Sequence, residues 1–154
     1  MKRVLMGCLA GFAATVPMTA AMVWLHRRLP HEERYPLPPQ EITEEASKGV
    51  GLDQHTDAEG QLGLALASHF AFGTAAGGMY GLLDEKIPLP PALRGATYGL
   101  AVWAVNYLGL LPAAGLYRSP AQEPRRRKAL MITAHLVWGP VLGVLLDRLQ
   151  ARTR

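Results

Sequence analysis

The sequence has little charge and only one cysteine. Asp, Glu, Lys and Arg make up 18% of its 154 residues, whereas ordinary soluble domains carry about 25%. Cys8 has no second cysteine to pair with, which excludes a disulfide-stabilised scaffold. Because 49% of the residues are hydrophobic, intrinsic disorder is excluded as well. The shortage of polar residues also disfavours a soluble domain with a single core.

The sequence also lacks the motifs of the common enzyme classes. It contains no Walker loop, no HExxH or CxxC motif and no Ser-His-Asp order. Ser68 and His69 are adjacent, but neighbouring residues on a helix point about 100° apart and do not form a nucleophile and base pair. We therefore expect no enzymatic activity and assign no catalytic residue; the alternative is a membrane-embedded enzyme that acts on lipid with the acidic 27–60 segment as its active face.

Uncharged residues are concentrated in four blocks. Residues 4–25, 61–83, 95–117 and 129–146 contain no Asp, Glu, Lys or Arg. A helix needs about 20 apolar residues to cross a hydrocarbon layer about 30 Å thick. A helix on a soluble protein would carry a polar stripe, and none of the four blocks has one. The pattern predicts an all-α, multi-pass membrane protein with four transmembrane helices in one domain over residues 1–154.

The residues that flank the blocks are typical of membrane interfaces. Lys2 and Arg3 could also begin a signal peptide, but the first block is long and ends at Trp24 and a pair of arginines, as a retained span does. Residues 125–128, Arg-Arg-Arg-Lys, directly precede the fourth block. We interpret them as anchors that reach lipid phosphates, so the expected partner is the bilayer and not a nucleic acid.

The distribution of positive charge leaves the orientation in the membrane open. Four spans place both termini and the 84–94 loop on one side, with seven Lys and Arg residues. The 27–60 and 118–128 loops lie on the other side with nine. The positive-inside rule does not separate these two counts.

The 27–60 segment is the longest connection and is acidic. It carries eight Asp and Glu residues against four Lys and Arg, a net charge of −4. Prolines within 36–39 predict an extended start, and residues 40–48 predict a short surface helix that ends at a glycine. The apolar stripe of this helix is Ile42, Ala46 and Val50. The acidic residues lack the spacing of a metal-binding loop, so we expect a solvated segment and no metal site.

Glycines recur at intervals of four residues in all four blocks. They are Gly7 and Gly11, then Gly73, Gly77 and Gly81, then Gly95 and Gly99, and finally Gly139 and Gly143. This spacing places the glycines of each block on one helix face, where the absence of side chains allows the close helix packing that lipid favours. We expect helix contacts at these faces, within the chain or between copies, and therefore a structural or interaction role as a homo-oligomer or as a subunit of a larger membrane complex.

The second and fourth blocks share a pattern. Both read His, two apolar residues, an aromatic residue and Gly-x-x-x-Gly, starting at His69 and His135. The first and third blocks share a weaker echo, Gly7-x-x-x-Gly11 and Gly95-x-x-x-Gly99. The pattern predicts two helical hairpins, 4–83 and 95–146, related by a pseudo-twofold axis along the membrane normal.

Polar residues inside the blocks are the candidate functional residues. Counted along antiparallel helices, five of them fall at a similar depth: Thr19, His69, Asn106, Tyr107 and His135. Three interpretations stay open. The layer provides hydrogen bonds between helices, or handles protons or a small solute, or binds haem through His69 and His135 with glycines one turn on leaving room for the porphyrin.

Several motifs are shared with a known family. His69-Phe-Ala-Phe is followed by Tyr80, Glu85 and Pro88, and the most distinctive run is His135-Leu-Val-Trp. In these motifs the chain resembles the uncharacterised YagU-like proteins, although its segment between the third and fourth blocks is shorter. The resemblance implies a multi-pass protein of the bacterial inner (plasma) membrane, with no settled activity, cofactor or catalytic residue.

Overall fold

The computed structural model describes residues 1–51, 55–84, 88–118 and 121–152, and these ranges are all-helical apart from turns and short connections. The long helices are α1 (Lys2–His26), α3 (Ala58–Leu83) and α6 (Arg125–Ala151). A fourth helical stretch consists of α4 (Pro91–Ala104), the π-helix η4 (Val105–Leu110) and α5 (Leu111–Ala113). Between α1 and α3 lie the 3-10 turn η1 (His31–Glu33) and α2 (Pro38–Gly49). Glu85, which belongs to the motifs above, and three residues included in the charge counts, Asp53, Lys86 and Arg154, lie outside the described ranges.

Helices α1, α3 and α6 are each long and apolar enough to cross a membrane. They contain 25, 26 and 27 residues, which corresponds to about 37–41 Å of helix. Each includes the whole of the uncharged block predicted for it, 4–25, 61–83 or 129–146. Helices α1 and α6 therefore extend past their apolar blocks at both ends, whereas α3 extends only at its N-terminal end and stops with its block at Leu83.

The third block differs from the prediction of 95–117 at both ends. Helical backbone begins at Pro91 and ends at Ala113, and Gly115 then adopts a φ of +69° that turns the chain. Between α4 and α5 the backbone stays right-handed but widens into a π-helix. Pro112 accounts for this change, because it has no N–H for the Leu108 carbonyl and its ring crowds that group.

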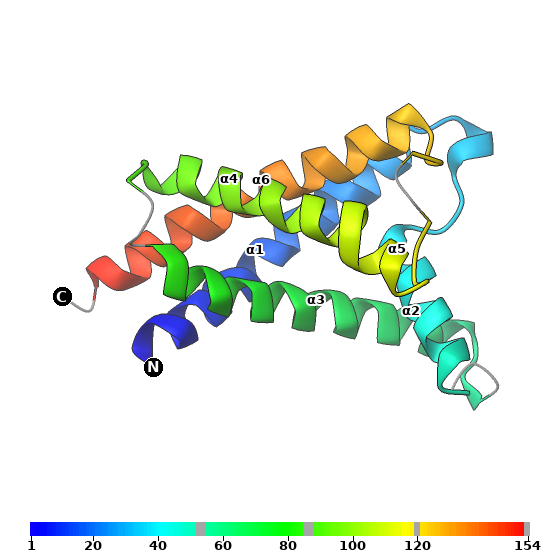
Figure 1. The fold of residues 1–154 in the computed structure, drawn as a ribbon, viewed down its shortest axis with the longest axis horizontal. Coiled ribbons are helices and arrows are strands. Elements are labelled where there is room, and N and C mark those ends of the chain that lie inside the picture. The colour runs from blue at the N-terminus through cyan, green and yellow to red at the C-terminus, as the bar shows by residue number, and fades with distance from the viewer. Residues whose placement is uncertain (52–54, 85–87, 119–120, 153–154) are drawn as a thin grey trace.

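The four helical stretches form an arc in the order α3, α1, α6, α4 (Figure 1). Helix α1 packs against α3 and α6, and α6 packs against α4. Long side chains join the two outer members of the arc: the Tyr98 hydroxyl donates a hydrogen bond of 2.8 Å to the Ala76 carbonyl, and the Tyr80 and Tyr98 rings are 5.0 Å apart. Helices α3 and α4 are thus held together by side chains and not by close backbone packing.

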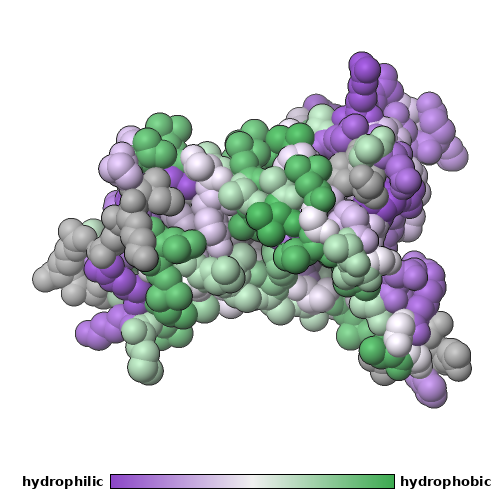
Figure 2. Space-filling model, viewed as in Figure 1, coloured by the Kyte–Doolittle hydropathy of each residue, from purple (hydrophilic) through white to green (hydrophobic). Residues whose placement is uncertain are grey.

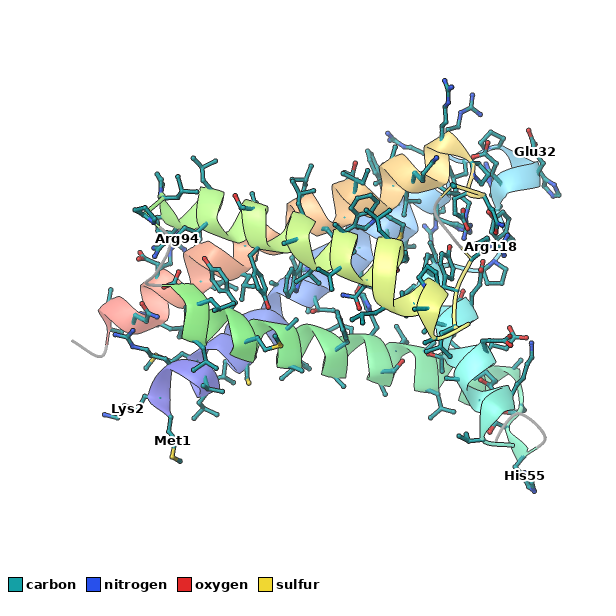
Figure 3. All side chains as sticks on the ribbon, in the orientation of Figure 1. Met1, Lys2, Glu32, His55, Arg94 and Arg118 are labelled. Carbon is teal, nitrogen blue, oxygen red and sulfur yellow. The ribbon has the colours of Figure 1, made fainter. Side chains whose placement is uncertain are left out.

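The two ends of the bundle carry different groups. Both termini lie at one end, together with Arg94, whereas Arg118 and α2 lie at the other (Figures 1 and 3). At the terminal end, Arg94 pairs with the buried Asp84 at 3.1 Å. On the face shown in Figure 2, hydrophilic residues gather at the end that contains α2, a few more lie at the other end, and apolar residues predominate in the middle. The distribution is that expected when the middle faces lipid.

Helix α2 lies against α3 at the end opposite the termini. The Thr43 and Ser68 hydroxyls are 2.9 Å apart, and the Ser47 hydroxyl lies 3.4 Å from the Gln61 amide oxygen. The predicted apolar stripe is wrong beyond Ile42: Ala46 and Val50 are exposed, and Ser47 is buried in their place. Hydrogen bonds to α3 therefore set the orientation of α2 more than its few apolar residues do.

Candidate functional site

The glycines of α1 and α3 bring these two helix backbones into contact. A Cβ atom at Gly77 would lie 2.6 Å from the Gly11 Cα and would collide with the Gly7 carbonyl. Gly73 faces Thr15, and Gly81 faces the Arg3 carbonyl. The predicted glycine ridges of the first and second blocks thus face each other across one interface.

The glycines of α4 and α6 form a second interface of the same kind. A Cβ at Gly99 would lie 2.6 Å from the His135 carbonyl oxygen, and Gly95 and Gly139 face each other's carbonyl groups. Gly143 faces the Pro91 carbonyl. All nine predicted glycines therefore contact a helix of the same chain. The space next to Gly139, expected to admit a porphyrin, is occupied by α4.

A cavity of about 240 Å³ lies between the helices in the half of the bundle that contains α2. Its described lining comprises Thr15 and Met18 of α1, Pro39, Ile42 and Thr43 of α2, Ser68, His69, Phe72 and Gly73 of α3, Val102, Asn106, Tyr107 and Leu111 of the α4–α5 stretch, and Met131, His135 and Trp138 of α6. Ser68 and Phe72 are exposed, so the cavity reaches the surface beside α3. No Asp, Glu, Lys or Arg is among these lining residues.

Four of the five predicted polar residues line this cavity: His69, Asn106, Tyr107 and His135. Thr19 is not among the lining residues, and its hydroxyl donates to the Thr15 carbonyl of its own helix at 2.8 Å. Thr15, one turn earlier, is fully buried and lines the cavity in its place. Counting residues from the helix ends predicted the polar layer but chose the wrong residue of α1, one helical turn from the one that lines the cavity.

The two histidines of the cavity make no hydrogen bond between helices within the described residues. His135 is 5% exposed, and its Nδ1 lies 2.8 Å from the Met131 carbonyl oxygen of the same helix. The Nε2 of His69 is buried and has no hydrogen-bond partner. Buried polar groups in proteins are nearly always hydrogen-bonded, so an unpartnered imidazole nitrogen in a cavity wall marks a position where a ligand can bind.

The π-helix η4 supplies the other two polar groups. Asn106 donates to the Val102 carbonyl at 2.8 Å through Nδ2, which leaves its amide oxygen available. The Tyr107 ring packs edge to face against His135 on one side, at 6.1 Å, and Tyr117 on the other, at 5.5 Å. Widened turns of this kind are frequent at functional sites, where they redirect side chains.

An ionic cluster, which we define as Glu41, Arg118, Glu123 and Arg127, lies beyond Tyr107 at the α2 end. Arg127 is 3% exposed and binds Glu123 at 3.2 Å and Glu41 at 3.3 Å. Its guanidinium also donates to the backbone carbonyls of Glu33, Tyr35 and Pro36. Arg118 reaches Glu41 at 3.0 Å and Glu123 at 3.4 Å. One arginine thus fastens the segment between α1 and α2 to the start of α6.

Two tyrosines donate hydrogen bonds to Glu123. The hydroxyls of Tyr35 and Tyr117 lie 2.9 and 2.8 Å from its carboxylate oxygens. Burial, together with the hydrogen bond to Glu123, raises the pKa of each of these two phenols above its usual range. Both phenols therefore stay protonated and keep donating to Glu123 at neutral pH.

Arg127 corrects the prediction that residues 125–128 are all lipid anchors. Arg125 and Arg126 are exposed, but Arg127 points into the protein and is saturated by protein groups. This difference was not predictable from the pattern, because the three arginines are consecutive. The same limit applies to Trp138 and Thr43, which line the cavity but were not predicted as site residues. Trp138 belongs to a motif used only for the family resemblance, and Thr43 is one of several hydroxyl residues in the sequence, so residue type alone did not mark either of them.

The comparisons with known proteins add a family but no activity. The whole chain, residues 1–154, matches a family described as "Family of unknown function (DUF6789)". No curated protein and no solved structure matches the chain.

Proposed function

The chain belongs to this family of unknown function, and we propose that it is a small multi-pass membrane protein that binds a small, mostly apolar molecule in the cavity between its helices. The observation that carries this proposal is the cavity of about 240 Å³ lined by two histidines, one of which has an unpartnered buried nitrogen. The proposal is a binding function and includes no catalytic residue.

The proposal includes a fourth crossing of the membrane by the α4–α5 stretch. Residues 91–113 are helical without interruption, and 23 residues span about 34 Å, enough for the hydrocarbon layer. The surface of this stretch is apolar, with Leu93, Leu100, Val105 and Leu108 exposed. The location in the bacterial inner membrane and the relation to the YagU-like proteins stay part of this proposal and rest on the resemblance of motifs.

We also keep the two-hairpin repeat as part of the proposal. Gly77 faces Gly7 and Gly11, and its counterpart Gly143 faces Pro91 and Gly95. In the proposed repeat, Gly11 therefore corresponds to Gly95. The sequence pattern Gly-x-x-x-Gly had suggested Gly99, which lies one helical turn later. The proposed repeat makes His69 and His135 equivalent, and both line the same cavity.

Membrane embedding predicts a simple extraction result. Fresh membranes washed with alkaline carbonate should retain the chain, and detergent should release it, because exposed apolar side chains such as Leu5, Leu9 and Phe12 favour lipid over water. Fractions are compared by immunoblot. A protein that is monodisperse in buffer without any amphiphile would contradict the membrane assignment.

The geometry of the cavity supports ligand binding as the role of the polar layer, in preference to hydrogen bonding between helices. If the polar layer served packing, its histidines would bond across helices, but His135 bonds within α6 and His69 Nε2 has no partner. An engineered apolar cavity of about 150 Å³ binds benzene, so a cavity of about 240 Å³ accepts a larger molecule. Met18, Phe72 and Leu111 provide an apolar wall for its body.

Filling the cavity should abolish binding. Val102 lines it, and Val102→Trp places an indole in the space that a ligand needs, whereas Val105→Trp adds the same bulk to an exposed position of the next turn. Small molecules that copurify in mild detergent are released by denaturation and quantified by mass spectrometry. We expect at least a tenfold lower yield of ligand per protein for Val102→Trp and no change for Val105→Trp.

The same samples separate this proposal from the alternatives. Both variants are first shown to be monodisperse with similar melting temperatures. A Soret band in the wild-type protein would replace the proposal with haem binding by His69 and His135. An equal ligand yield from the two variants would refute binding in this cavity. Self-association, which the native mass reports, would have to use surfaces other than the nine glycines, because these are occupied within the chain.

A further inference from the structure

The hydrogen bond made by His135 fixes which of its ring nitrogens carries the proton. A backbone carbonyl only accepts hydrogen bonds, so the Nδ1 that lies 2.8 Å from the Met131 oxygen must be protonated. A positive charge on this ring would need an acidic partner, and no described residue that lines the cavity is acidic. The ring is therefore neutral, and its Nε2 presents a lone pair that accepts a hydrogen bond.

This assignment restricts the chemistry of a ligand. A carbonyl or an ether has no hydrogen to donate to Nε2. A carboxylate or phosphate would be buried without a Lys or Arg, and an ammonium group without an Asp or Glu, since the described lining contains none of these residues. The ligand group that suits His135 is neutral and has a hydrogen that it can donate to Nε2.

The second histidine fits the same group. His69 Nε2 is buried without a partner, and in its protonated tautomer it donates to an oxygen. A hydroxyl group donates one hydrogen bond and accepts others, so it can donate to His135 and accept from His69. The aromatic and aliphatic side chains of Phe72, Met131 and Trp138 then contact the rest of the molecule.

We propose that the cavity binds an apolar molecule through a single hydroxyl group, an alcohol or a phenol, which donates its hydrogen to His135 Nε2. This inference rests on the proposed function and narrows it to one ligand class. The molecule would be a neutral amphiphile that reaches the protein by dissolving in the membrane.

Three bicyclic probes of nearly equal shape test the inference. 2-Naphthol donates and accepts hydrogen bonds, 2-methoxynaphthalene only accepts, and naphthalene does neither. Binding is followed by quenching of Trp138, which lines the cavity, in a Trp24→Phe, Trp103→Phe background reconstituted in nanodiscs. We expect 2-naphthol to bind at least tenfold more tightly than the other two, the effect of one buried hydrogen bond.

Variants assign the effect to His135. His135→Phe should reduce 2-naphthol binding about tenfold, to the level of naphthalene. The matched control His55→Phe removes an exposed histidine that does not line the cavity and should change nothing. Independently of any ligand, nitrogen NMR should show that the His135 ring carries its proton on Nδ1.

The outcomes distinguish this inference from the proposed function. Equal binding of 2-naphthol and 2-methoxynaphthalene, or a His135 ring protonated on Nε2, overturns the hydroxyl inference and leaves ligand binding intact. The absence of binding by all three probes, together with no copurifying molecule, overturns both.

Discussion

Replacing Gly77 with leucine is expected to abolish the folded state. A Cβ at this position would lie 2.6 Å from the Gly11 Cα and 2.9 Å from its nitrogen, both backbone atoms that move only if the two helices separate. Even Gly77→Ala should cost about 1–3 kcal/mol, the usual penalty for overpacking, and leucine should cost more. Size-exclusion chromatography in mild detergent should show an aggregated or degraded product for Gly77→Leu.

Gly63 provides the matched control in the same helix. A Cβ at Gly63 meets nothing within 4 Å, so Gly63→Leu adds the same side chain to an open position of α3. This variant should elute and melt like the wild-type protein, and the glycine-to-leucine change as such would then be harmless to the helix. If Gly77→Leu also behaved as wild type, the α1–α3 contact described here would be refuted.

Replacing Arg127 with methionine is expected to produce the largest loss of stability among charged residues. The change keeps most of the side-chain volume but removes two ion pairs and three hydrogen bonds to backbone carbonyls. It leaves Glu123, which is 8% exposed, with a much weaker partner in Arg118. Breaking a buried ion pair costs about 3–5 kcal/mol, which we expect to lower the melting temperature by roughly 10 °C.

Arg126 is the control for this prediction. It precedes Arg127 directly and is exposed, so Arg126→Met should shift the melting temperature by no more than about 2 °C. Arg127→Lys separates charge from geometry, because lysine keeps the charge but cannot make the forked contacts. Equal melting of Arg126→Met and Arg127→Met in tryptophan fluorescence scans would show that the ionic cluster does not stabilise the fold.

Much of the helical architecture followed from composition and spacing. Charge-free blocks gave the cores of α1, α3 and α6, because lipid-facing and core-facing residues of such helices are both apolar and only the ends must be polar. The glycine spacing marked the residues that the structure places at two helix interfaces, since the need for close approach leaves a regular pattern in the sequence. It did not specify which glycines face each other.

The pattern of residues in the sequence did not predict the π-helix or the cavity. Periodicity assumes a constant turn, and η4 departs from it only where Pro112 disturbs the backbone. The cavity arises because α3 and α4 are not packed closely along their length. The separation of these two helices depends on how all four helical stretches are arranged. The polar residues at matching depths, His69, Asn106, Tyr107 and His135, were still predictable, because a buried polar group in lipid is costly wherever it lies.

The ionic cluster was unpredictable for a different reason. Glu41 comes from the 27–60 connection, and Arg118, Glu123 and Arg127 come from the 118–128 connection, both of which are polar segments that the sequence places outside the bundle. Their proximity follows from the turn at Gly115 and from the extended backbone at Leu37, just before α2, which bring these residues over the same end of the bundle. The number of charges in each segment does not show which segments meet in the folded protein.

The central place of α1 sets an order for assembly during synthesis. Its contact with α3 joins residues within the first 83 and is available once that part of the chain has been made, whereas its contact with α6 must wait for the last helix. Until then, in the proposed membrane topology, one face of α1 lies against lipid or the insertion machinery; this face includes the Gly11 carbonyl that later accepts a 3.4 Å hydrogen bond from Trp138. A ribosome stalled after residue 124, just before α6, would therefore hold a paired α1 and α3 in which the α6-binding face of α1 is still unoccupied.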